Sequence, residues 1–158
     1  SDLPTGVYAF REGSEEVESS DNLASIKDLG DKVEITISIR SSREDMKDQM
    51  KEEFASIFES NGFEVTLKKE YPSWEYREES PLRDLASKVH QSMFGHPFEV
   101  IVIHAGLEAG VVVSKYPHMD IISIGPNITG AHTPKERLEL ASTERVYNFL
   151  VKLLEEIR

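Results

Sequence analysis

The chain has 158 residues, of which 39% are hydrophobic and 8% aromatic, enough for one ordinary domain or two small ones with a buried core. Its formal net charge of -11 repels phosphate backbones and anionic lipids, so we expect no nucleic-acid partner and no membrane partner. The sequence has no cysteine, which excludes disulfides and leaves His, Asp and Glu as the metal ligands. No apolar run approaches the roughly 20 residues of a membrane span, and no signal-peptide pattern is present. We therefore expect a soluble, cytoplasmic protein.

The first half of the sequence predicts a small sheet. Strands are expected at 7–10 and 17–26, and the clearest one at 33–40, where aliphatic and polar residues alternate. This alternation places Arg40 on the polar face of its strand, away from the core.

One amphipathic helix is predicted to cover this sheet. Ser41 and Glu44 have the spacing of a capping box, and apolar residues then recur at helical intervals until Asn61-Gly62. Residues 63–67 alternate again and predict a returning strand. The expected order is strands, helix, strand, as in an α+β sandwich.

The second half has a different pattern. Ser80-Pro81 predicts the start of a helix that ends at Gly95, and apolar-rich strands are expected at 98–103 and 120–124 before a final helix around residues 146–157. Helices that alternate with buried strands indicate an α/β layer, but two strands are fewer than a stable open sheet normally has. Something else should complete this layer.

We place the domain boundary in the polar and aromatic segment between these halves. The predicted organisation is an α+β segment at 1–70, a connection at 71–79 and an α/β segment at 80–158. An exposed edge strand of the first segment could pair with another chain.

Polar residues follow the predicted strand 98–103. His104 and Glu108, with Gly106 and Gly110 beside them, would lie at the carboxyl edge of the sheet, where open α/β folds bind ligands. A simpler interpretation is that the two glycines permit a tight turn and that a backbone hydrogen bond satisfies His104. The spacing alone favours this simpler interpretation.

A second loop carries His132. The following Thr133, Pro134 and Glu136 predict a capped turn, which would fix the backbone beside the histidine. Because His132 follows a second predicted strand, it can be aimed at the same sheet edge as His104. Two His and one Glu can hold a catalytic zinc ion, so His104, Glu108 and His132 form one possible metal site.

Several short motifs, taken in order, are specific. They are YPSW at 71–74, SP at 80–81, HAGLE at 104–108, SIGP at 123–126 and GAHTP at 130–134. In this order they resemble the C-terminal part of bacterial aminoacyl-histidine dipeptidases, also called cytosol non-specific dipeptidases, of the M20 class of zinc peptidases. Residues 17–23 and 39–41 are similar to the smaller lid domain of that family.

The resemblance implies a hydrolase that cuts dipeptides with a free N-terminus, using two zinc ions that activate a bridging water. It implies that His132 is a zinc ligand, that Arg40 engages the substrate and that Gly106 lies in a substrate-contacting loop. It also implies a lid-type sandwich followed by the C-terminal α/β part of a catalytic domain, and a homo-oligomer, expected as a dimer.

The other groups of the family's site are missing from this sequence. The remaining zinc ligands and the general-base glutamate come from a His-x-Asp motif and a Glu-Glu motif, and neither precedes Val7. The first hypothesis is therefore a portion of a metallodipeptidase that is inactive as this isolated chain. The alternatives are a non-catalytic binding or dimerisation module and, last, a stand-alone enzyme with the His104, Glu108 and His132 site.

Overall fold

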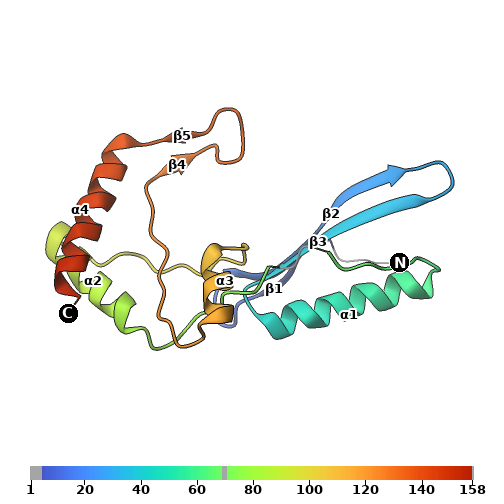
Figure 1. The fold of residues 1–158 in the computed structure, drawn as a ribbon, viewed down its shortest axis with the longest axis horizontal. Coiled ribbons are helices and arrows are strands. Elements are labelled where there is room, and N and C mark those ends of the chain that lie inside the picture. Colours follow the sequence, from blue (N-terminus) through green and yellow to red (C-terminus); the bar gives the residue numbers. More distant parts are fainter. Residues whose placement is uncertain (1–4, 69–70, 158) are drawn as a thin grey trace. The chain divides into compact units, whose positions relative to one another are not determined.

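A computed structural model of the chain describes residues 5–68 and 71–157. The chain forms two compact units (Figure 1). The first unit comprises Ser1–Arg77 and Ile101–Pro117, and the second comprises Glu78–Val100 and His118–Arg158. The mixture of helices and strands confirms the predicted α/β class. The predicted domain boundary at 71–79 stays a prediction. The compact units are divided differently, because residues 101–117 pack with the N-terminal residues.

The first unit contains an antiparallel sheet of three strands in the order β1-β2-β3. Its strands are β1 (Gly6–Phe10), β2 (Val17–Asp28) and β3 (Val33–Ser41), which confirms the three predicted strands. In the register of the central pair, Ser20 lies opposite Arg40 and Ser19 opposite Ser41. Because side chains alternate between faces, Ser20 and Arg40 share one face of the sheet.

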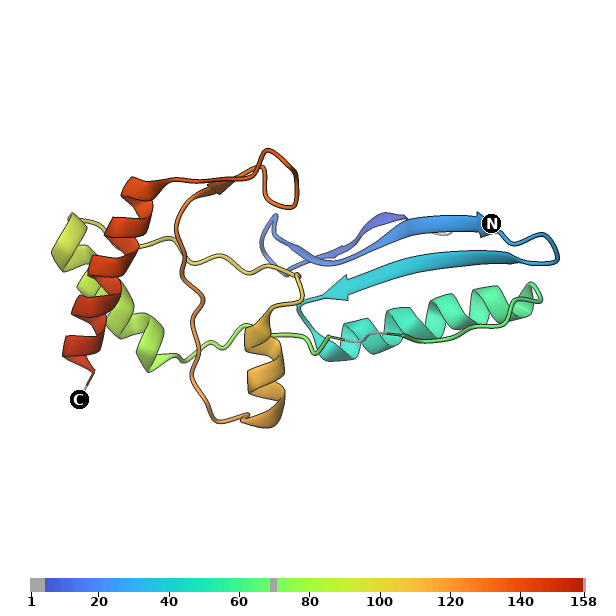
Figure 2. The same ribbon diagram turned by 45° about the horizontal axis from the view of Figure 1, so that its top comes forward.

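Helix α1 (Glu44–Ser60) runs along the sheet (Figure 2). It buries Met50 and Phe54, as the helical spacing predicted. Tyr8 of β1 donates a 2.5 Å hydrogen bond to Glu53 of the helix. Together these contacts fix the helix on one face, which leaves the Arg40 face for other groups.

The predicted capping box is wrong. The N-cap is Arg43, without a side-chain cap, because Ser41 is still paired within the sheet. The Ser41 hydroxyl accepts from the Arg43 backbone N–H at 3.0 Å and bonds to the Ser19 hydroxyl at 2.8 Å. The predicted helix end is confirmed, since Asn61 is the C-cap and Gly62 has φ +84°.

Three predicted strands are absent. Residues 63–67, 98–103 and 120–124 are described but have no secondary structure. A strand requires hydrogen-bonded neighbours, and these segments find none among the described residues. The side chain of Ile101 is accordingly 65% exposed, although its sequence is typical of a buried strand.

The second unit is built on two helices. Helix α2 (Pro81–Phe94) begins at Ser80, which caps the Arg83 N–H, and ends at Gly95 with φ +83°, as predicted. Helix α4 (Leu140–Glu156) packs on α2 through a core of Ala86, Val89, Phe149 and Leu153. A short hairpin of β4 (Ile128–Thr129) and β5 (Arg137–Leu138) precedes α4.

Candidate active site

Arg40 lies near the end of β3 with its side chain exposed, as the alternation predicted. Within residues 5–68 and 71–157, no carboxylate forms an ion pair with its guanidinium. A guanidinium matches the geometry of a carboxylate and binds it through two parallel hydrogen bonds. Arg40 is therefore available to an external carboxylate.

His104 lies in the first unit and bonds to the sheet. Its Nε2 is 2.9 Å from the hydroxyl of Ser20. Burial lowers the pKa of His104, and the nearby charge of Arg40 lowers the pKa further. The bond to Ser20 is a side-chain bond, and the expected backbone hydrogen bond of His104 stays a prediction.

Close packing requires the glycine of this loop, Gly106, and the glycine of the helix that follows it, Gly110. A Cβ on Gly106 would lie 3.2 Å from the side chain of Tyr71, and a Cβ on Gly110 would lie 2.5 Å from the carbonyl oxygen of Pro72. Neither glycine has a positive φ. Close approach to residues 71–72 explains both glycines, and the simpler interpretation of a glycine-dependent turn stays a prediction.

We expect Gly110→Ala to destabilise the chain by a net ~1 kcal/mol. Gly110 lies in helix α3 (Glu108–Lys115), where alanine is favoured by about 1 kcal/mol. The added Cβ would overlap a backbone oxygen that cannot rotate away, and overpacking costs about 1–3 kcal/mol. Urea unfolding measures the difference. The control is Gly125→Ala, whose Cβ would meet nothing within 4 Å; equal stability of the two variants would contradict the packing argument.

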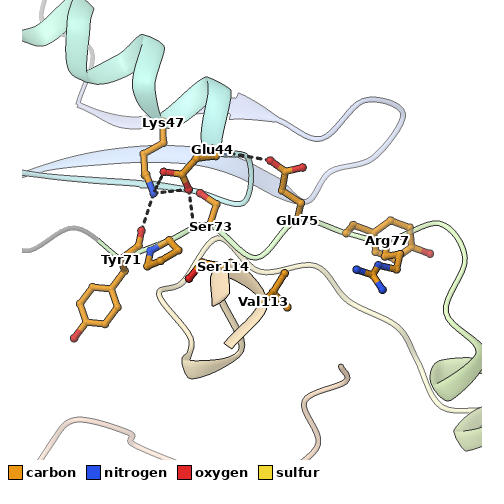
Figure 3. Close-up of a pocket in the computed structure, with 10 residues that line it drawn as sticks. Glu44, Lys47, Tyr71, Ser73, Glu75, Arg77, Val113 and Ser114 are labelled. Atoms are coloured by element: carbon orange, nitrogen blue, oxygen red, sulfur yellow. Dashed lines mark hydrogen bonds and ion pairs between the residues drawn. The ribbon is translucent and has the colours of Figure 1, made fainter. Parts of the chain in front are cut away.

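The segment at 71–77 holds the start of α1 (Figure 3). The Glu44 carboxylate accepts from the Ser73 N–H at 2.7 Å and from Lys47 Nζ, while Lys47 also donates to the Tyr71 carbonyl at 2.7 Å. Lys47 is buried, and its pairing with Glu44 satisfies the ammonium group. These bonds fix the segment against which Gly106 packs.

A cavity of about 600 Å³ opens beside this segment, lined in part by Glu44, Tyr71 and Ser114 (Figure 3). None of the predicted site residues lines it. The sequence analysis missed the Glu44 and Lys47 pair, whose spacing of three residues on a helix is the signal that could have found it.

His132 lies in the turn between β4 and β5, in the second unit. It has φ +64°, and it is the only described residue other than glycine with a positive φ. The Glu136 carboxylate accepts from the His132 N–H at 2.8 Å, and Thr133 caps the Lys135 N–H at 3.2 Å. The predicted capped turn is thus present, but it does not begin a helix.

The His132 side chain in this turn is exposed to solvent. No group in the described part of the chain hydrogen bonds to either ring nitrogen. A histidine in a strained backbone conformation, held by a neighbouring carboxylate, is a candidate functional residue. Across residues 5–68 and 71–157, no three His, Asp or Glu side chains are grouped to hold a metal ion.

The sequence of the chain matches a known protein family. Residues 3–156 match the family described as peptidase family M20/M25/M40. The chain belongs to this peptidase family. It is 36% identical over 141 residues to the cytosol non-specific dipeptidase of Escherichia coli (strain K12), a match that covers 89% of this chain and 29% of that protein.

A solved structure has a fold similar to that of this chain. The chain is similar to the aminoacylhistidine dipeptidase of Vibrio alginolyticus, with a TM-score of 0.80 and 31% sequence identity over 98% of this chain. It covers 32% of that structure, so the chain spans about a third of the length of these relatives. None of its described helices is long and apolar enough to cross a bilayer.

Proposed function

We propose that the chain is the lid and terminal catalytic portion of a metal-dependent dipeptidase that hydrolyses dipeptides with a free N-terminus. The observation that carries this proposal is an unpaired Arg40 on the sheet face to which the HAGLE loop is bonded, in a chain of the M20/M25/M40 family. The two relatives named above are dipeptidases, which supports the substrate class.

Arg40 and Gly106 are the proposed substrate contacts. Arg40 binds the C-terminal carboxylate of the dipeptide, and Gly106 offers its exposed backbone to the substrate. If an arginine at the end of the site binds the C-terminal carboxylate, only a peptide of the right length can reach both the arginine and the reacting centre. This arrangement favours dipeptides over longer peptides.

His132 is the proposed metal ligand. Both of its ring nitrogens are without partners among the described residues, and the turn around it is fixed by Glu136, so the residue fits a ligand role. Two zinc ions in the complete enzyme would polarise the peptide carbonyl and supply a deprotonated water at neutral pH. The other ligands and the general base come from outside this sequence, so we propose that the isolated chain is inactive.

The exposed apolar segments fit this proposal. Val100, Ile101 and Ile103 are each at least 45% exposed, in a run whose composition is typical of a central strand. The remainder of the catalytic domain would supply neighbouring strands and cover them. We propose a cytoplasmic enzyme, in line with the E. coli relative named as cytosolic.

The lid is also the proposed dimer contact. Strand β3 pairs only on its β2 side among the described residues, and Ile26 and Val33 of the β2–β3 hairpin are 61% and 50% exposed. An unpaired, apolar edge can pair with a second copy.

The substrate class is tested on the full-length protein with a panel of one dipeptide, its N-acetyl form, its C-terminal amide and the corresponding tripeptide. We expect turnover of the free dipeptide and at least about tenfold lower kcat/KM for the other three, since each loses a charge contact or the right length. Comparable turnover of the amide would contradict the role of the carboxylate.

Replacing Arg40 with Met is expected to raise KM for the dipeptide by about 10- to 100-fold, because one charge-assisted pair to the substrate is lost. The matched control is Lys32→Met in the β2–β3 turn, which removes a charge from the same hairpin. An unchanged KM in Arg40→Met would exclude Arg40 from substrate binding.

The second candidate function is a non-catalytic binding or dimerisation module, which the unpaired edge of β3 favours. It predicts a self-associating protein without turnover of any member of the panel, whereas the dipeptidase predicts turnover.

A further inference from the structure

Two long-range hydrogen bonds fasten the extended segment before the HAGLE loop to the sheet. The Val102 N–H donates to Glu16 at 3.2 Å, and the His104 ring bonds to the Ser20 hydroxyl at 2.9 Å. The partners are separated by 86 and 84 residues in the sequence. These bonds therefore set where residues 102–104 lie on the first unit.

The hydrogen bond of the His104 ring is compatible with a neutral imidazole. The His104 ring bonds to the Ser20 hydroxyl through Nε2, and either atom can be the donor. A neutral imidazole has one donor nitrogen and one acceptor nitrogen, so a neutral ring can make this bond.

Arg40 favours the same state. Ser20 is the direct cross-strand neighbour of Arg40, and Arg40 is the charged group whose field reaches the His104 ring. Burial and this field lower the pKa of His104, so the ring stays neutral at neutral pH. The nearby carboxylate of Glu16 is bonded to Arg11 and to Val102.

The opposite side of the loop is held by packing. Gly106 lies against the Tyr71 side chain, and the Tyr71 carbonyl is bonded to the buried Lys47. The loop is therefore fixed by His104 on the sheet side and by Tyr71 on the other. Moving either support would move the backbone at Gly106.

We propose that His104 is a positioning residue for substrate binding, which fastens the Gly106 loop to the strand neighbour of Arg40 so that the two substrate contacts keep a fixed separation. This inference rests on the proposed function. His104 itself touches neither substrate nor metal.

Steady-state kinetics of the full-length enzyme test this role. In His104→Ala, KM for the dipeptide should rise about tenfold while kcat changes less than about twofold, since a binding contact is misplaced and the chemistry is not. Ser20→Ala should act in the same direction, and the double variant should be no worse than His104→Ala, because both remove one bond. His104→Gln offers a donor and an acceptor and should recover most of the loss.

The matched control is His118→Ala, an exposed loop histidine that should leave KM unchanged. If His104→Ala lowers kcat and leaves KM unchanged, or if the effects of Ser20→Ala and His104→Ala are additive, the positioning role is wrong. An inactive wild-type enzyme would overturn the proposed function and this role with it, whereas an active enzyme with normal KM in His104→Ala would overturn this role alone.

The bond itself has a readout that does not need activity. In protein labelled with ¹⁵N-histidine, the His104 signals, assigned by their loss in His104→Gln, should show a ring that is neutral at neutral pH, with a pKa below that of a free histidine and an Nε2 shift that changes in Ser20→Ala. A ring that titrates as a free histidine does, or an Nε2 shift that is unchanged in Ser20→Ala, would contradict the proposed bond.

Discussion

Replacing His132 with Ala in the full-length protein is expected to lower kcat/KM for dipeptides at least about 100-fold and to reduce the zinc content. Loss of a residue that merely supports a metal ligand costs about 10- to 100-fold, and loss of a ligand costs more. His132 suits this role because the turn holds its backbone at φ +64° while its ring has no partner in the described part of the chain.

The control for this prediction is Lys135→Ala in the same turn. Lys135 is exposed, and its backbone N–H, which Thr133 accepts, is retained in the variant. We expect normal activity and zinc content. If His132→Ala retains both zinc ions and full turnover, His132 is not a ligand; if Lys135→Ala is equally inactive, the turn as a whole and not the imidazole is responsible.

Replacing Asp21 with Val is expected to stabilise the chain by about 1–3 kcal/mol at pH 7. Asp21 lies on β2 and is 4% exposed, and neither carboxylate oxygen has a hydrogen-bond partner in the described structure. A buried polar group without a partner costs about this amount, and a β-branched residue suits the strand. Urea unfolding of the chain measures the gain, with the exposed turn residue Asp31 replaced by Asn as the control.

The pH dependence of stability provides a second check on Asp21. Burial raises the pKa of this carboxyl in the folded state, so the folded chain binds a proton that the unfolded chain releases. Its contribution to stability is therefore largest below the unfolded pKa of about 3.9 and is lost as the pH rises toward the folded pKa. The Val variant should lack this loss. A destabilised Val variant would show that Asp21 has a partner that stabilises its charge.

Local signals in the sequence predicted much of the fold. Helix α2 was predicted from Ser80, Pro81 and Gly95, because caps depend on a few adjacent residues. The capping box at Ser41 failed because the strand pairing of Ser41 with Ser19 overrides its local preference. The strand at 98–103 was wrong because strands depend on partners that are distant in the sequence.

The candidate site could be predicted only in part. The alternation in β3 was enough to place Arg40 on the exposed face. The bond between His104 and Ser20 joins residues 84 positions apart, and the burial of Asp21 depends on the packing of the first unit, so neither has a local signature. The roles of His132 and Gly106 rest on the family resemblance and stay predictions.

The most direct test of the account compares the full-length protein with the isolated 158-residue chain, each titrated with zinc by calorimetry and assayed for dipeptide hydrolysis. We expect tight binding of two zinc ions and turnover by the full-length protein, and neither by the chain alone, because His132 is the one proposed ligand in this chain. Two tightly bound zinc ions with turnover by the isolated chain, or no turnover by the full-length protein, would contradict it.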